Sequence, residues 1–123
     1  MSRNWLLYLD DLIASGEKIG RLVSGRSFET FCADEAAFDA VLFNLQVIGE
    51  SVKNLPPEAL AAIPEASDLG PARLRDLIAH HYFALDADII WDVATTRVPS
   101  LLSQAVRVRE LADRSGSETE DLE

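Results

Sequence analysis

Three side chains that can act together on a phosphodiester lie within eight residues of the chain, at Arg75, His80 and Tyr82. Arginine stays charged at neutral pH and can hold a phosphate through two parallel hydrogen bonds. Histidine has an unperturbed pKa of about 6.5, so it can take up and return a proton near neutral pH. The pair is a weak signal by itself, because a single histidine is more often a hydrogen-bonded structural residue. Tyrosine, in turn, is often an interface anchor.

These side chains suit the cleavage of a phosphodiester, and the steps are clearest if that phosphodiester belongs to RNA. A proton must leave the ribose 2′-hydroxyl, the phosphorane must be stabilised, and the leaving 5′-oxygen must be protonated. His80 suits the proton transfers, and Arg75 suits binding and neutralisation of the phosphate. Tyr82 can position the substrate by hydrogen bonding or stacking, and Asp76 can orient the neighbouring groups. We interpret His81 as a variable residue of the motif, and we expect no metal ion and no cofactor.

A regular helix does not gather the three side chains on one face. Each residue turns the helix by about 100°, which places His80 about 140° from Arg75, whereas Arg75 and Tyr82 share a face. Three explanations stay open: the helix distorts near His80, the length of the arginine closes the gap, or a second protomer supplies the missing groups. An isologous dimer would also double the positive charge at the cleft.

Other polar residues have both a functional and a structural interpretation. Glu50 follows Gly49 on a predicted helix and could face the motif and hold Arg75, or it could simply be solvated. A set of acids near the start of the last predicted helix is spaced like a metal cluster, but acids in a first turn also interact favourably with the helix dipole, which we prefer. These acids are Asp86, Asp88 and Asp92.

The whole chain has the composition of an ordinary globular domain. Its 123 residues are 48% hydrophobic and 26% charged, and no apolar run approaches the roughly 20 residues that cross a bilayer. The first residues lack the pattern of a signal peptide, so we expect a cytoplasmic protein without membrane contact. Cys32 is the only cysteine, which excludes an intrachain disulfide.

The net charge of −10 argues against a general nucleic-acid binder, because such domains usually carry a basic face. Residues 115–123 contribute four acids and no base, which leaves −6 for the rest of the chain. Any contact with RNA would therefore be local. The arginines that could build it are Arg73, Arg75, Arg97, Arg107 and Arg109.

Hydrophobic periodicity predicts helices at 3–23 and 28–54, a short helix at 57–64, another at 72–82 and a last one from residue 86. Pro56 and Pro57 end the second helix, and Pro99 should kink or divide the last one. No β-type alternation is present. We therefore predict an all-α fold, an antiparallel up-and-down four-helix bundle with an extra short helix, over residues 1–114. Residues 115–123 form an acidic tail that we expect to be disordered.

The order of these features resembles the HepT-like toxins of the HEPN superfamily over nearly the whole chain. The matching features are Ile48-Gly49-Glu50, the proline-rich break, an Arg-polar-x-x-x-His-x-Tyr motif at residues 75–82, and the later Asp88, Trp91 and Pro99. The resemblance implies a homodimer whose motifs line a cleft and cleave RNA without metal, with Arg75 and His80 catalytic. One departure is Asp76, where such motifs most often have asparagine.

The same resemblance implies a partner. HepT-like toxins are paired with a minimal nucleotidyltransferase antitoxin, MntA-like, that adds AMP to the motif tyrosine, which here is Tyr82. The expected setting is a type VII-like toxin–antitoxin module. Two alternatives remain: a non-catalytic helical module that helps a nucleotidyltransferase bind nucleotide or substrate, and a plain dimerisation scaffold in which His80→Ala changes nothing.

Overall fold

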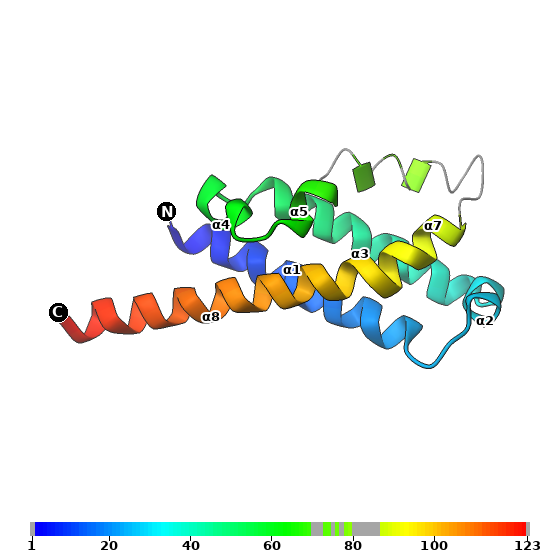
Figure 1. The fold of residues 1–123 in the computed structure, drawn as a ribbon, viewed down its shortest axis with the longest axis horizontal. Helices are drawn as coiled ribbons and strands as arrows, with labels where there is room; N and C mark the ends of the chain where they lie inside the picture. Colours follow the sequence, from blue (N-terminus) through cyan, green and yellow to red (C-terminus); the bar gives the residue numbers. More distant parts are fainter. Residues whose placement is uncertain (1, 70–72, 75, 77, 80–86, 123) are drawn as a thin grey trace.

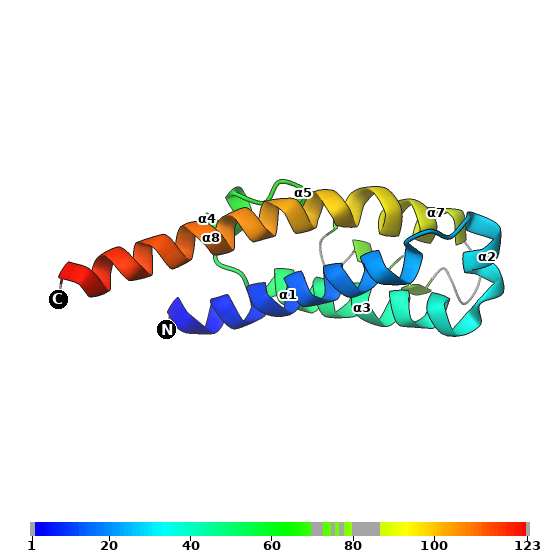
Figure 2. The ribbon, with the colours of Figure 1, turned by 90° about the horizontal axis from the view of Figure 1, so that it is seen from below.

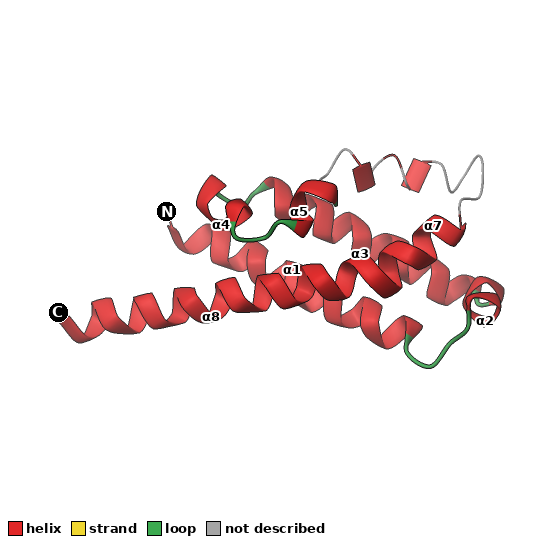
Figure 3. Ribbon diagram, viewed as in Figure 1, coloured by secondary structure: helices red, strands yellow, loops and turns green. Residues whose placement is uncertain are grey.

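The computed structural model describes the chain except residues 1, 70–72, 75, 77, 80–86 and 123. Arg75, His80, His81, Tyr82 and Asp86 lie outside the described residues. The described part is helical with short connecting turns and contains no strand (Figure 3). The helices are α1 (Ser2–Val23), α2 (Phe28–Ala33), α3 (Glu35–Lys53), α4 (Pro57–Ala61), α5 (Glu65–Asp68), α7 (Ala87–Asp92), the π-helix η1 (Val93–Arg97) and α8 (Val98–Leu122). The all-α prediction is confirmed for this part of the chain.

Helix α1 lies between α3 and α8 and packs on both of them (Figures 1 and 2). The chain runs along α1 in one direction and returns along α3 and again along α8, so α1 is antiparallel to both. The predicted apolar stripes form the core: Leu9, Leu12 and Ile19 of α1 are fully buried, as are Leu45 and Ile48 of α3. Burial of these stripes is the main source of stability.

The close contact between α1 and α8 requires a small residue at position 16. A Cβ atom built on Gly16 would lie 3.3 Å from Cδ1 of Leu102 and 3.7 Å from Cγ1 of Val98. The side chains of Leu102 and Val98 on α8 therefore pack against the backbone of α1 at this point.

The predicted helix at 28–54 is wrong as a single element, because Asp34 divides it into α2 and α3. The backbone N–H of Asp34 donates to the carbonyl of Phe31 at the end of α2, and its carboxylate accepts from the N–H of Ala37 at the start of α3. Its other carboxylate oxygen accepts from Arg26 at 2.8 Å. An aspartate that caps one helix and ends another competes with continued helix, which periodicity alone does not reveal.

Asp34 should make the stability of the fold depend on pH in the acidic range. The hydrogen bond from Arg26, and then that from Ala37, hold the pKa of Asp34 below its usual value. Such a group stabilises the fold above its unfolded pKa, and this contribution is lost as the pH falls through the lowered folded pKa. Since asparagine also caps helices, Asp34→Asn keeps the hydrogen bond from Ala37 and removes the charge together with the oxygen that accepts from Arg26.

The midpoint temperature of unfolding of wild type should exceed that of Asp34→Asn at neutral pH, and the difference should shrink below about pH 4. Thermal unfolding of both proteins, followed by circular dichroism across this range, measures it. A difference that is constant with pH would contradict the assignment.

The last predicted helix is divided, as Pro99 indicated. Proline has no N–H and its ring crowds the carbonyl four residues earlier, here that of Thr95. The structure relieves this with a π-helical turn directly before the proline, in which the N–H of Val98 donates to the carbonyl of Val93. Helix α8 then continues to Leu122, through the segment that composition predicts to be disordered, and its end extends beyond the other helices (Figure 1). The division into 1–114 and 115–123 stays a prediction.

No helix in the described part of the chain is both long and apolar enough to span a membrane.

Candidate functional site

A groove of about 430 Å³ opens between α3 and the described residues of segment 72–82, which carries the Arg-His-Tyr motif and which we call the motif segment. We call it the α3 groove. It is lined by Phe43, Gln46, Val47, Gly49, Glu50, Leu74 and Ile78. Leu74 and Ile78 come from the segment that carries the Arg-His-Tyr motif, so the groove joins the two regions that sequence analysis singled out.

The period of α3 explains which of its residues reach the groove. Phe43, Gln46, Val47 and Glu50 recur at three and four residues and so share a face of the helix, away from the fully buried Leu45 and Ile48. Gly49 lies at the edge of that face and is itself buried. Since glycine has no side chain, it leaves room for the groove between α3 and Leu74.

The motif segment is anchored on the core beside this groove. Leu74 is 1% exposed, and Ile78 is partly buried against the core cluster. In the sequence these two residues bracket Arg75 and Asp76. Asp76 is exposed and is not among the residues that line the groove. The predicted functions of Arg75, His80 and Tyr82 concern residues outside the described part.

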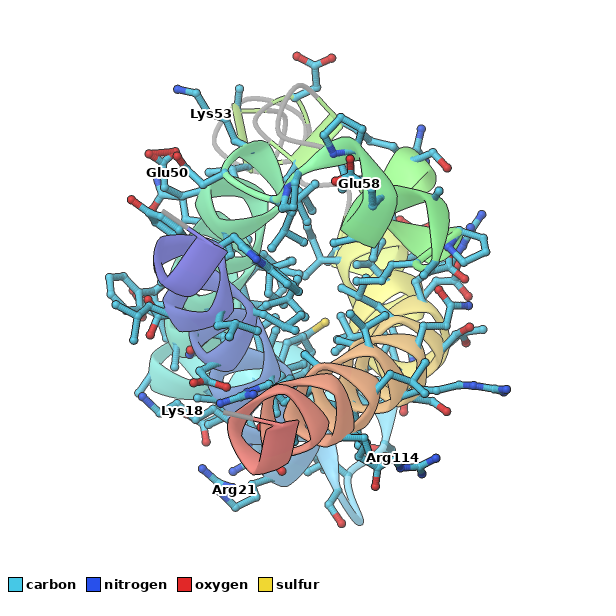
Figure 4. The ribbon with its side chains drawn as sticks, turned by 90° about the vertical axis from the view of Figure 1, so that its left-hand side faces the viewer. Lys18, Arg21, Glu50, Lys53, Glu58 and Arg114 are labelled. Carbon is cyan, nitrogen blue, oxygen red and sulfur yellow. The ribbon has the colours of Figure 1, made fainter. Side chains whose placement is uncertain are left out.

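The position of Glu50 fits both interpretations made from the sequence, a residue that faces the motif and a solvated one. Glu50 is exposed and lines the α3 groove with the neighbours of Arg75. Figure 4 shows Glu50 and Lys53 on the outer side of α3, both pointing away from the centre of the bundle. Glu50 forms no ion pair with another residue of the described part. Its contact with Arg75 stays a prediction.

Sequence reasoning missed Phe43 and Gln46. The Phe43 side chain is 63% exposed, whereas Phe31 and Phe38 are buried. The only sequence signal was a large aromatic residue on the polar face of an amphipathic helix, and such residues usually need no explanation. Its significance comes from its place in the groove.

Two of the arginines considered for RNA binding form ion pairs within the protein. Arg97 of η1 donates to Glu65 of α5 at 2.8 Å. Arg109 of α8 donates to Asp10 of α1 at 2.7 Å and to Asp113 at 2.6 Å, and the hydrogen bond with Asp10 raises the pKa of Arg109. These contacts join helices and compete with any phosphate for the same guanidinium groups.

Arg73 and Arg107 are exposed, and the described part of the chain provides no ion pair for either. Arg73 precedes the buried Leu74 by one residue, so it is the described cation nearest in sequence to the motif. Asp88 and Asp92 are exposed on α7. Among the residues that the structure describes, no group of three or more histidine, cysteine or acidic side chains is placed to hold a metal ion.

Comparison with known proteins identifies the family. The family model described as "Ribonuclease HepT-like" matches residues 12–108. A protein of Methanocaldococcus jannaschii named as a "Putative RNase" is 38% identical over 93 residues, which cover 76% of this chain and 77% of that protein. The "Probable ribonuclease HepT" of Thermococcus cleftensis is 32% identical over 110 residues, covering 89% of this chain and 100% of that protein.

A third relative, named as a "Putative RNase" of Caldanaerobacter subterraneus, is 33% identical over 101 residues, covering 82% of this chain and 90% of that protein. No solved structure matches the chain. The match of the family model spans α3, the motif segment and the first part of α8, and so includes every residue named above as lining the α3 groove. The chain therefore belongs to the HepT-like ribonuclease family.

Proposed function

We propose that this protein is a metal-independent endoribonuclease and the toxin of a type VII-like toxin–antitoxin module that acts in the cytoplasm. Membership of a ribonuclease family gives the reaction class. The α3 groove supports a location for this reaction. Gly49 and Glu50 line it together with Leu74 and Ile78, the two residues that bracket Arg75 in the sequence.

In this mechanism Arg75 holds the scissile phosphate and offsets the charge that develops on the phosphorane. His80 transfers the proton, taking it from the 2′-hydroxyl or giving it to the leaving 5′-oxygen. Glu50 accepts from the guanidinium of Arg75 and so fixes its direction. Asp76 orients the neighbouring groups, and Tyr82 positions the substrate.

We further propose that the active form is a homodimer of four-helix bundles, with the segment 72–82 as the fourth member beside α1, α3 and α8. Two observations support the dimer. The net charge of −10 gives one copy little attraction for RNA. A regular helix also separates Arg75 from His80 by about 140°. Two copies related by a two-fold axis would bring two motifs to one cleft and supply both imidazoles and both guanidinium groups there.

The proposed antitoxin is an MntA-like nucleotidyltransferase that adenylylates Tyr82. A phosphate and an adenosine placed two residues from His80 would obstruct the cleft by negative charge and bulk. Expression with this partner should add the mass of one adenylyl group to the peptide that contains Tyr82. Mass spectrometry of the digested protein measures this, with Tyr82→Phe as the control that cannot be modified at that position.

Expression without a partner tests the catalytic proposal in cells. Wild type should arrest growth and fragment cellular RNA, and His80→Ala should do neither. Equal growth and equal RNA integrity for the two proteins would remove the catalytic assignment and leave the fold intact.

The acidic charge favours one alternative, a non-catalytic module that helps a nucleotidyltransferase to bind nucleotide or substrate. Arg75 would then hold a phosphate without cleavage, and His80 would be structural. The alternative predicts that the wild-type protein expressed alone is harmless.

A further inference from the structure

We propose that the α3 groove binds a nucleobase of the RNA substrate, with the ring of Phe43 as a stacking surface and the amide of Gln46 at the edge of the base. This inference rests on the proposed function, since it names the part of the substrate that the groove recognises. It adds two residues to which sequence analysis assigned no function.

Phe43 is the most exposed phenylalanine in the part of the chain that the structure describes. Its side chain is 63% exposed, whereas Phe31 is fully buried and Phe38 is 6% exposed. Exposed aromatic rings beside a nucleic-acid path commonly stack on bases, and such stacking tolerates any base because every base has a π-face.

The lining of the groove suits an uncharged base better than a phosphate. Among the lining residues that the structure describes, Phe43, Val47, Leu74 and Ile78 give the groove apolar walls, and Glu50 alone is charged. A phosphate inside the groove would lie against that carboxylate and be repelled by it, whereas an uncharged base would not. The volume of about 430 Å³ lies within the usual range for small-molecule pockets.

Gln46 supplies polar recognition in the same place. It is exposed and lies one turn along α3 from Phe43. Its amide carries both donors and an acceptor, the combination that can pair with the edge of a base. A stacked base beside Phe43 would therefore meet a polar group at one edge.

The position of the groove links the base to the reaction. Leu74 and Ile78 line it, and in the sequence they bracket Arg75, the proposed phosphate ligand. A nucleotide whose base lay in the groove would have its phosphate close to the segment that carries the motif. The groove would then help to set which bond is cleaved.

Binding of RNA without cleavage tests the inference. The probe is a short single-stranded RNA of mixed sequence, and every protein carries His80→Ala so that the probe stays intact. Adding Phe43→Ala should raise the dissociation constant about 5- to 150-fold, and Phe43→Trp should keep the affinity. Leu7→Ala is the matched control, because Leu7 is 64% exposed and lies outside the groove, on α1; it should leave the dissociation constant unchanged.

A second probe isolates the base. A ribose–phosphate oligomer of the same length without bases should bind equally to proteins with and without Phe43→Ala. An equal loss of affinity on both probes would overturn the inference, as would unchanged affinity on the RNA or no measurable binding of RNA.

The alternative occupant of the α3 groove is a second copy of the chain. Light scattering should give the same oligomeric state with and without Phe43→Ala, and dissociation caused by this variant would overturn the base-binding assignment. Failure of the proposed function is distinguishable, because it would appear as equal RNA cleavage by wild type and His80→Ala, whatever the effect of Phe43 on binding.

Discussion

Replacement of His80 by alanine is expected to lower the rate of RNA cleavage by about 10²- to 10⁴-fold, the usual contribution of a positioned general acid or base. The chain has two histidines, and the other is the adjacent His81. His81→Ala is therefore the matched control. It removes the same chemical group one residue away, and we expect it to keep most of the activity.

Single-turnover cleavage of one labelled RNA by the three purified proteins measures this difference. Circular dichroism of each protein shows whether the helical content is unchanged, so that loss of structure is not mistaken for loss of chemistry. Loss of activity in His81→Ala, with His80→Ala active, would move the catalytic assignment to the neighbouring residue. Equal rates for all three would contradict imidazole catalysis altogether.

Phe31→Ala is expected to cost about 3–5 kcal/mol of unfolding free energy, a large share of the roughly 5–15 kcal/mol that stabilises a typical domain. Phe31 is fully buried in α2. Its ring is stacked on that of Phe38 at 5.1 Å and tilted against that of Trp91 at 5.1 Å. The side chain thus joins α2 to α3 and to α7, and its removal leaves a cavity among three helices.

Phe28→Ala is the control for this prediction. Phe28 lies on the same short helix, is partly exposed, and meets Trp91 edge-on at 6.2 Å. Phe28→Ala should therefore cost clearly less unfolding free energy than Phe31→Ala. Urea denaturation gives the comparison, with the midpoint lowered most for Phe31→Ala and the slope unchanged. Equal midpoints for the two variants would show that the aromatic cluster does not stabilise the fold as its geometry indicates.

Much of the fold could be predicted because helix periodicity and proline chemistry act locally. The buried stripes of α1 and α3 and the interruption of the last helix before Pro99 all follow from residues a few positions apart. The break at Asp34 was missed because an aspartate inside an apolar pattern is compatible with continued helix. The helix breaks there because Asp34 contacts Arg26, Phe31 and Ala37 at the same time.

The candidate site could be predicted in part. Residue types in the motif and the Gly49-Glu50 pair pointed to one region, and the structure places Glu50 in a groove with the neighbours of Arg75. Phe43 could not be found this way, because exposure depends on which other segment covers the face of a helix. The sequence also gave no reason to separate Arg97 and Arg109, which are paired with acids, from Arg107, which is exposed.

The ion pairs of Arg97 and Arg109 also bear on how strongly the chain can attract RNA. Arg97 and Arg109 are paired with nearby carboxylates, and the chain has 21 acids against 11 lysines and arginines, so one copy attracts a phosphate backbone weakly. A cleft shared by two copies is a physical solution, since it brings two sets of motif arginines to one strand of RNA.

Dilution of the wild-type protein with an inactive variant tests the shared cleft most directly. Arg75→Ala/His80→Ala copies are mixed with wild-type copies, subunits are allowed to exchange, and the cleavage rate per wild-type copy is measured as the inactive excess rises. If both motifs of a dimer are needed at one cleft, a tenfold excess should lower that rate about tenfold, because nearly every wild-type copy then has an inactive partner. A rate per wild-type copy that stays constant, with mixed dimers shown to form, would contradict the account.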